Sequence, residues 1–257
     1  MSIAIADRAG ARTLTIDRPG AKNAFDERVI AELTQAVAAA TVDAAVQVVV
    51  LTATGDVFSA GGDLKWMRRA AHLTREENLA DAQALARLLQ AIDGCPKPTV
   101  ARVQGSAFGG AVGLIAACDI AVAAAHAEFA TSEVRLGLIP AVISPYVIRA
   151  VGLRAARRLF LTGERISANE AHRIGLIHEV VPKSDLDAGV ERLVAALLAG
   201  GPNAQAATKG LLAKVGGAIA NDATAVTADA LANIRASAEA REGIDAFFAK
   251  RPPQWRE

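Results

Sequence analysis

The feature that most constrains the fold is a regular alternation of buried strands with helical segments. The run VQVVVLTA, residues 46–53, is β-branched and apolar, which is typical of a strand covered on both faces. It follows a segment that starts at Asp26, a good N-cap, and then places apolar residues on one helical face. A second round has a helix at about 76–93, a turn at CPKP and a strand at 99–104. We therefore expect an α/β fold.

The two ends of the chain differ from this middle part. Residues 2–17 read as two alternating strands joined at 8–10, which is a hairpin signal. After GGPNA the chain is Ala-rich and has no strand pattern, and we expect helices at roughly 203–216, 221–240 and 241–250. The expected organisation is an α/β core over residues 1–199 and a helical subdomain over residues 200–257.

Length, charge and cysteine usage narrow the functional classes. With 257 residues, 52% of them hydrophobic, the chain can bury a large core without a disulfide or a metal. Its 28 Lys and Arg against 27 Asp and Glu lack the basic excess of a general nucleic-acid binder. Cys95 and Cys118 have no metal or redox spacing, and neither a signal peptide nor a membrane-length apolar run is present. We expect a cytoplasmic protein with reduced thiols, no metal, and neither a membrane nor a nucleic-acid partner.

Two glycine pairs each lie between a predicted strand and a predicted helix. FSAGGDLKWM contains Gly61 and Gly62, followed by Asp63 as a helix cap, and QGSAFGGAVGL contains Gly109 and Gly110. The first amides of a helix have no internal partner, so either turn can bind a negative oxygen. The alternative is that the glycines only permit tight packing of strand against helix.

Competing catalytic motifs are missing. The sequence has no P-loop and no GxGxxG fingerprint, and Ser59 does not fit a nucleophile elbow because residue 57 is Val. The four histidines show no metal-ligand spacing. The sequence therefore does not support catalysis by a metal or by a serine.

Three motifs, FSAGGDLK, QGSAFGGAVGL followed by ACDI, and FATSEVRLGLIP, resemble in order and spacing those of the enoyl-CoA hydratase/isomerase (crotonase) family. The resemblance covers essentially the whole chain, including LTGERISANEAHRIGLIHEVVP at 161–182. It implies a superhelix of repeated strand-strand-helix units with a C-terminal helical region used in trimer contacts. It also implies an acyl-CoA substrate, no cofactor apart from coenzyme A as part of that substrate, and a homotrimer or a hexamer made of two trimers.

The resemblance also implies roles for individual residues. The amides of Gly62 and Gly110 would form an oxyanion hole, and Glu133 would transfer protons. Hydratases of the family commonly use a second glutamate, but its position here is Gly113, so Glu133 acts alone unless another group moves in. Without the resemblance, an N-cap or an ion pair with Arg135 is an equally good interpretation of Glu133.

Within the family, DLKWM, RLGLIPAVISPYV and Gly113 most resemble hydratases of 3-methylglutaconyl-CoA in leucine breakdown and of longer isohexenylglutaconyl (carboxygeranoyl) thioesters. Such substrates carry a second carboxylate, for which Lys65, Trp66, Arg68, Arg69, Arg135, Ser144 and Tyr146 are the available residue types. The arginines equally suit a solvated helix surface, and Trp66 and Tyr146 equally suit the walls of an acyl pocket. The expected CoA- and substrate-binding set is Lys22, Ala24, Ala60, Gly61, Asp63, Leu64, Lys65, Trp66, Gly109, Gly113, Arg135, Tyr146 and Lys250, with Lys22 and Lys250 as weaker candidates for phosphates.

The leading hypothesis is an enoyl-CoA hydratase that acts on a branched glutaconyl thioester. A single carboxyl can take a proton from water and return it to Cα, and an apolar pocket is expected to raise its pKa. One acid also suits a 3,2-enoyl-CoA isomerase, which moves a proton between two carbons. A non-catalytic acyl-CoA-binding family member is the third hypothesis, because position 113 has no acid.

Overall fold

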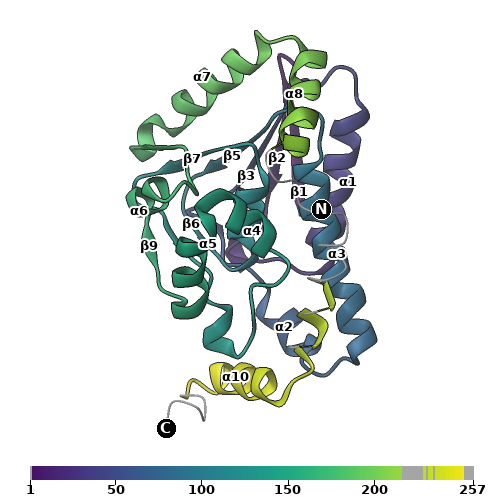
Figure 1. Ribbon diagram of the computed structural model, residues 1–257, viewed down its shortest axis with the longest axis vertical. Coiled ribbons are helices and arrows are strands. Elements are labelled where there is room, and N and C mark those ends of the chain that lie inside the picture. The colour runs from purple at the N-terminus through teal and green to yellow at the C-terminus, as the bar shows by residue number, and fades with distance from the viewer. Residues whose placement is uncertain (1, 216–227, 230, 234, 252–257) are drawn as a thin grey trace.

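The computed structural model describes residues 2–215, 228–229, 231–233 and 235–251. Their strands form two sheets, with helices around both (Figure 1). The six-stranded sheet has the order β1 (Ile3–Arg8), β2 (Ala11–Ile16), β3 (Val48–Ala53), β5 (Thr99–Val103), β7 (Ile120–Ala124) and β10 (Glu179–Val181). The four-stranded sheet has the order β4 (Val57–Ser59), β6 (Ser106–Phe108), β8 (Glu128–Ala130) and β9 (Ile166–Ser167).

Strand direction separates the hairpin from the rest. β1 and β2 are antiparallel and are joined at Ala9 and Gly10, both of which have positive φ, so the predicted hairpin is confirmed. The other neighbours in the larger sheet are parallel. In the smaller sheet β4, β6 and β8 are parallel to one another, and β9 pairs antiparallel with β8.

Successive strand pairs divide between the two sheets. The first strand of each pair, β3, β5 or β7, joins the larger sheet, and the second, β4, β6 or β8, joins the smaller one. Helical segments follow each pair before the chain returns to the larger sheet. This strand-strand-helix repeat confirms the α/β superhelix that the family resemblance implies.

Helix starts follow the local sequence. Asp26 accepts the N–H of Val29 at the start of α1, and Thr74 forms a capping box with Glu77 at the start of α3. The α-helices are α1 (Glu27–Val42), α2 (Leu64–Ala70), α3 (Arg75–Asp93), α4 (Gly110–Ala117), α5 (Ser144–Thr162), α6 (Ala168–Arg173), α7 (Leu186–Leu198), α8 (Pro202–Val215) and α10 (Ala238–Phe248). Short 3₁₀ helices are η1 (Pro19–Ala21), η2 (Glu133–Leu136) and η3 (Lys183–Asp185).

The larger sheet is covered on both faces. Val49 and Leu51 of β3 belong to the main core, which includes buried side chains of α1, α3 and α4. Val48 and Val50, which alternate with them, pack in a second cluster with Leu186 and others of α7. Alternate residues of a strand point to opposite faces of the sheet. Since both faces are covered here, every residue of β3 is buried.

The C-terminal region reaches back to the middle of the chain. Ala240 and Ile244 of α10 pack with Ala71 and Leu138, and α10 lies beside α2 (Figure 1) and contacts η2. Of the helix expected at 221–240, part lies outside the described residues, whereas residues 228–229, 231–233 and 235 are helical. The expected division at residue 199 stays a prediction. In the described ranges no helix has the length and apolarity needed to cross a bilayer.

Candidate active site

The site is built at one edge of the smaller sheet. β4, β6 and β8 are parallel neighbours, so their carboxyl ends lie at the same edge. The chain leaves β4 into Gly61 and Gly62, leaves β6 into Gly109 and Gly110, and leaves β8 toward Glu133. Three segments that are far apart in the sequence therefore meet at one place.

The first glycine turn is held by backbone and side-chain hydrogen bonds. Gly61 has φ 87°, donates its N–H to Ser59 Oγ and accepts from the N–H of Phe25. Asp63 donates its N–H to Phe25 O, and its carboxylate accepts from two amides of the first turn of α2. The N–H of Gly62, between them, has no acceptor among the described residues.

The second glycine turn has the same property. Gly109 has φ 54° and donates its N–H to Ala130 O at the end of β8, which ties the turn to the third strand. Gly110 is the first residue of α4, where a helix amide has no internal partner. Across the described part of the chain, no acceptor is found for this N–H either.

The two turns are in direct contact. A Cβ added to Gly61 would lie 2.7 Å from Phe108 O and 3.7 Å from Gly109 Cα. Only glycine permits this approach at φ 87°. Two amides without acceptors therefore border one cavity, which is the arrangement that can bind an oxyanion.

Glu133 faces the second turn. A Cβ added to Gly109 would lie 3.4 Å from Glu133 Oε1, and Oε2 is buried with no hydrogen-bond partner among the described residues. The residue as a whole keeps some exposed surface, but its carboxyl is buried, and this burial raises the pKa of Glu133 to about 7. A hydrogen bond from the backbone N–H of Glu133 lowers the pKa and so opposes part of this rise. Arg135 is exposed, and Glu133 forms no ion pair with any described residue. The N-cap of η2 is Ser132, not Glu133. The ion-pair and N-cap interpretations of Glu133 are therefore both wrong.

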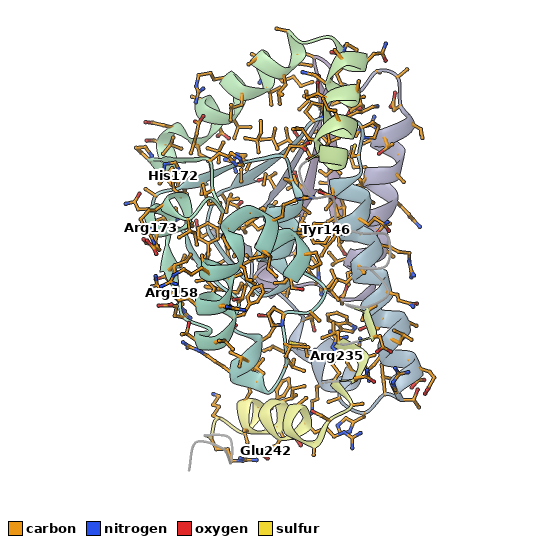
Figure 2. All side chains as sticks on the ribbon, viewed as in Figure 1. Tyr146, Arg158, His172, Arg173, Arg235 and Glu242 are labelled. Atoms are coloured by element: carbon orange, nitrogen blue, oxygen red, sulfur yellow. The ribbon has the colours of Figure 1, made fainter. Side chains whose placement is uncertain are left out.

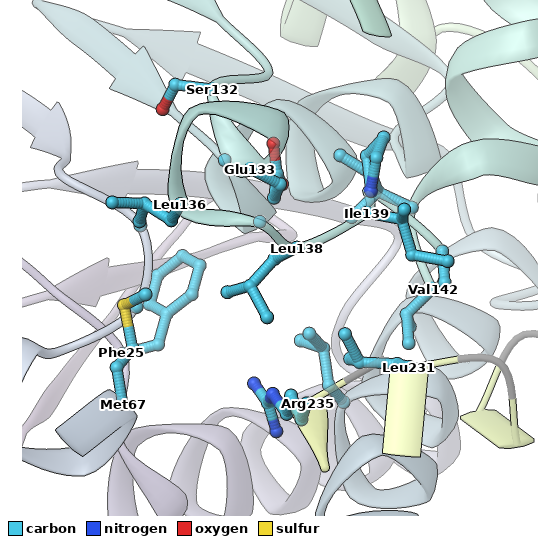
Figure 3. Close-up of a pocket in the computed structure, with 18 of the residues that line it drawn as sticks. Phe25, Met67, Ser132, Glu133, Leu136, Leu138, Ile139, Val142, Leu231 and Arg235 are labelled. Carbon is cyan, nitrogen blue, oxygen red and sulfur yellow. The ribbon is translucent and has the colours of Figure 1, made fainter. Parts of the chain in front are cut away.

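The cavity is mostly apolar and has a volume of about 200 Å³. Among its described lining residues, only Glu133 and Arg235 are charged (Figure 3). The other side chains are almost all apolar, including Phe25, Met67 and Leu138. From the expected set, Ala60, Gly61, Gly62, Leu64, Trp66, Gly109, Gly110 and Glu133 line it.

Gly113 lies beneath the cavity wall. It is buried in α4, and a Cβ there would overlap Ile143 Cγ2 and lie 2.7 Å from Ile143 Cβ. Ile143 itself lines the cavity. The space that a second glutamate at position 113 would need is therefore filled by this isoleucine, and Gly113 does not line the cavity as expected.

The remaining expected residues lie outside the cavity lining. Lys22, Lys65 and Lys250 are exposed, Ala24 is buried and bonds to Ala21, and Asp63 follows the first glycine turn as the N-cap of α2. Arg135 is exposed on η2, and Tyr146 is buried on α5 beside Arg149 (Figure 2). Arg135 and Tyr146 are thus not brought into the acyl cavity. The coenzyme A contacts of the three lysines stay predictions.

Sequence reasoning missed Arg235. It is 7% exposed, lines the cavity and contacts α2 and α3 through Trp66 and Asp81 (Figure 2). A signal was present, because Arg235 follows Ala228, Leu231 and Ala232 at the spacing of one buried helical face. A charged residue within such an apolar stripe indicates a buried role.

Comparisons with known proteins agree with this geometry. The sequence profile of the family described as enoyl-CoA hydratase/isomerase matches residues 7–257. A Thermus thermophilus protein provisionally named an enoyl-CoA hydratase is 36% identical over 93% of this chain and 95% of its own. A crotonyl-CoA hydratase of Syntrophomonas wolfei is 34% identical over 93% of this chain and 91% of its own.

A solved structure extends the likeness to three dimensions. An enoyl-CoA hydratase from Shewanella pealeana is 46% identical, and the match covers 99% of this chain and 96% of that chain with a TM-score of 0.82. The fold described above is thus shared with that solved structure. The chain is a member of the enoyl-CoA hydratase/isomerase family.

Proposed function

We propose that the protein is an enoyl-CoA hydratase that adds water reversibly across the 2,3 double bond of an acyl-CoA thioester. The observation that carries this proposal is the meeting of two amides without described acceptors and one unpaired carboxyl at a single apolar cavity. Family relatives named as hydratases support the same activity.

The two glycine amides stabilise the charge that develops on the substrate. The N–H groups of Gly62 and Gly110 donate to the thioester carbonyl oxygen, and their hydrogen bonds strengthen as that oxygen becomes an enolate. Because both amides are fixed by the contact between the turns, little rearrangement is needed at the moment of reaction.

Glu133 moves the proton. In its ionised form it takes a proton from water while the water oxygen bonds to Cβ and the double-bond electrons move onto the thioester oxygen. The protonated Glu133 then gives that proton to Cα as the enolate collapses. The substrate gains one water in total, and Glu133 returns to its starting state, which a pKa of about 7 permits near neutral pH.

The favoured substrate is a branched glutaconyl thioester such as 3-methylglutaconyl-CoA. The local resemblance of DLKWM and RLGLIPAVISPYV supports this choice. Ile143 supports this choice too. It fills the place where a second acid would stand, and its apolar side chain in the cavity wall can contact a branched acyl group. Assembly into trimers or hexamers and a cytoplasmic location also remain parts of the proposal.

The activity is tested by loss of the absorbance of the conjugated enoyl thioester, over a panel of short, branched and dicarboxylic enoyl-CoA substrates. Hydration of 3-methylglutaconyl-CoA faster than of straight-chain substrates is the expected result. Binding of the whole panel without turnover of any member would contradict the proposal and favour a non-catalytic acyl-CoA-binding protein.

The single carboxyl keeps isomerisation as a second candidate. A 3,2-enoyl-CoA isomerase needs one base that removes a proton and returns it two carbons away, and Ile143 leaves no room for another acid at position 113. Incubation of a 2-enoyl-CoA and, separately, of a 3-enoyl-CoA in ¹⁸O-labelled water separates the two reactions. A hydratase puts label into the 3-hydroxyacyl product of the 2-enoyl substrate and leaves the 3-enoyl substrate unchanged, whereas an isomerase converts the 3-enoyl substrate into an unlabelled 2-enoyl product.

A further inference from the structure

Arg235 is the cation in the cavity wall. Its side chain is 8% exposed, and it is the single positively charged residue among the described residues that line the cavity. Figure 3 places it on the opposite side of the cavity from Glu133, with Leu138 between them. A guanidinium in such apolar surroundings is costly unless it has partners of opposite charge.

Two residues hold Arg235 from behind. Its Nη1 is 2.6 Å from Asp81 Oδ2, and its Cζ lies 4.9 Å from the centroid of the Trp66 ring. Trp66 donates its indole N–H to Asp81 Oδ1 at 3.2 Å, so the three side chains form one cluster. Asp81 does not line the cavity, whereas Arg235 and Trp66 do. The cluster therefore presents its positive member to the cavity.

Arg235 has unused hydrogen-bonding capacity. A guanidinium has five N–H donors. Within the described part of the chain, Nη1 makes the hydrogen bond to Asp81, and neither Nη2 nor Nε has an acceptor. Burial lowers the pKa of Arg235 and raises that of Asp81, each against the attraction of the other. The N–H groups on Nη2 and Nε are thus available to a further anion.

The other basic residues near this region lie outside the cavity lining. Arg68 lies over the Phe248 ring at 5.3 Å, and Arg69 pairs with Glu27. Lys65 and Arg135 are exposed. None of these four lines the cavity, so the basic residues expected from the sequence do not supply a charge to its far side.

We propose that Arg235 receives the terminal carboxylate of a dicarboxylic acyl chain whose thioester end lies at the Gly62 and Gly110 amides. The inference rests on the proposed function for the placement of the thioester. The free edge of the guanidinium donates in bidentate fashion to the carboxylate, while Asp81 and Trp66 fix its orientation. Arg235 is thus the residue that selects dicarboxylic over monocarboxylic acyl groups.

The test measures binding of saturated thioesters that undergo no hydration. Isothermal titration gives dissociation constants for 3-methylglutaryl-CoA and for 3,5-dimethylhexanoyl-CoA, in which an isopropyl group replaces the carboxylate. For Arg235→Met we expect affinity for the dicarboxylic ligand to fall roughly 100-fold, with no loss for the branched hydrocarbon. Equal losses for both ligands, which a merely structural role would give, or no loss for either, would overturn the proposal.

Arg149 offers a matched control. It also pairs with an aspartate, Asp93, and lies over an aromatic ring, Tyr146 at 5.8 Å, but it does not line the cavity. Arg149→Met is expected to leave both dissociation constants unchanged. If it lowers the ratio of the two affinities as strongly as Arg235→Met, the selectivity does not come from Arg235.

Asp81→Asn tests the cluster without removing the cation. The asparagine keeps an oxygen for the Trp66 indole and removes the negative charge that competes for Arg235. We expect tighter binding of 3-methylglutaryl-CoA and unchanged binding of the hydrocarbon thioester. Weaker binding of both would show that the pair only anchors the C-terminal segment. Because these measurements need no turnover, failure of the hydratase assay is distinguishable from failure of this inference.

Discussion

Glu133 and Arg235 lie in the wall of the same cavity, but they are held in opposite ways. Glu133 Oε2 is buried and has no hydrogen-bond partner in the described part of the chain, whereas Arg235 is paired with Asp81 and lies over Trp66. An unpaired acid stays close to its neutral form, so its proton exchanges easily. A paired guanidinium keeps its charge and its position. The first arrangement suits proton transfer, and the second suits recognition.

Glu133→Gln should have the largest effect. The amide keeps the size of the side chain but cannot take a proton from water, so we expect kcat for hydration to fall roughly 10³-fold or more. Absorbance of the conjugated thioester follows the reaction, and binding of a saturated acyl-CoA serves as the control. A variant that binds normally and still hydrates at the original rate would move the proton transfer away from residue 133.

Gly61→Ala should disrupt the same end of the cavity through the backbone. The added Cβ would lie 2.7 Å from Phe108 O at a residue with φ 87°, so the two glycine turns must separate. A shift of this kind is expected to lower kcat roughly 100-fold. Gly20→Ala is the matched control, because nothing lies within 4 Å of its added Cβ. Equal activity of the two variants would show that contact between the turns is not required.

Glu133 and Arg235 should also differ in how their substitution changes the stability of the folded protein. The pKa of Glu133 is about 7 in the folded protein against 4.5 for an ordinary glutamate, so the folded state binds more protons between these pH values. Its contribution to stability is complete below pH 4.5 and is lost as the pH rises through about 7. Glu133→Gln should therefore be more stable than the parent at pH 8 by up to about 3 kcal/mol, with little difference at pH 4.

Arg235→Met should show the opposite sign, because it leaves Asp81 buried without its partner. We expect a loss of about 3 kcal/mol at pH 8. Urea unfolding of the two variants over a range of pH measures both effects. If both variants lose stability at pH 8, Glu133 is not the unsatisfied acid described above.

The smallest expected change concerns the missing second acid. Gly113→Glu must displace Ile143, and overpacking of this kind costs about 2 kcal/mol. The same substitution in an Ile143→Ala background should cost less, because the alanine opens the space above position 113. Free energies of unfolding for the four proteins of this double-mutant cycle give the coupling. If the stability losses of Gly113→Glu and Ile143→Ala simply add in the double variant, Ile143 is not the residue that excludes a second acid from position 113.

Local features of the fold could be predicted from the sequence. The hairpin at Ala9 and Gly10, the fully buried strand β3 and the capped start of α1 each depend on residues that are close in the chain. The short strand β8 was missed, because its three residues give too little pattern to recognise. β8 is nevertheless the strand that brings Glu133 to the glycine turns.

Long-range contacts account for most of what sequence reasoning could not supply at the site. The pair of Asp81 and Arg235 joins residues 154 positions apart, and neither shows its partner in its local sequence. The absence of an acid at Gly113 was visible, but its replacement by Ile143 follows from packing of α4 against the residue that precedes α5. The family resemblance pointed to the acid and the amides, whereas the cation needed the tertiary structure.

The protonation of Glu133 in the free enzyme is the most direct test of this account. Protein labelled with ¹³C at the glutamate carboxyl carbons can be titrated by NMR, with Glu133→Gln used to assign the resonance. An unpaired, buried proton carrier is expected to titrate with a midpoint near pH 7, whereas a midpoint near 4.5 would show a solvated or paired carboxylate and contradict the account.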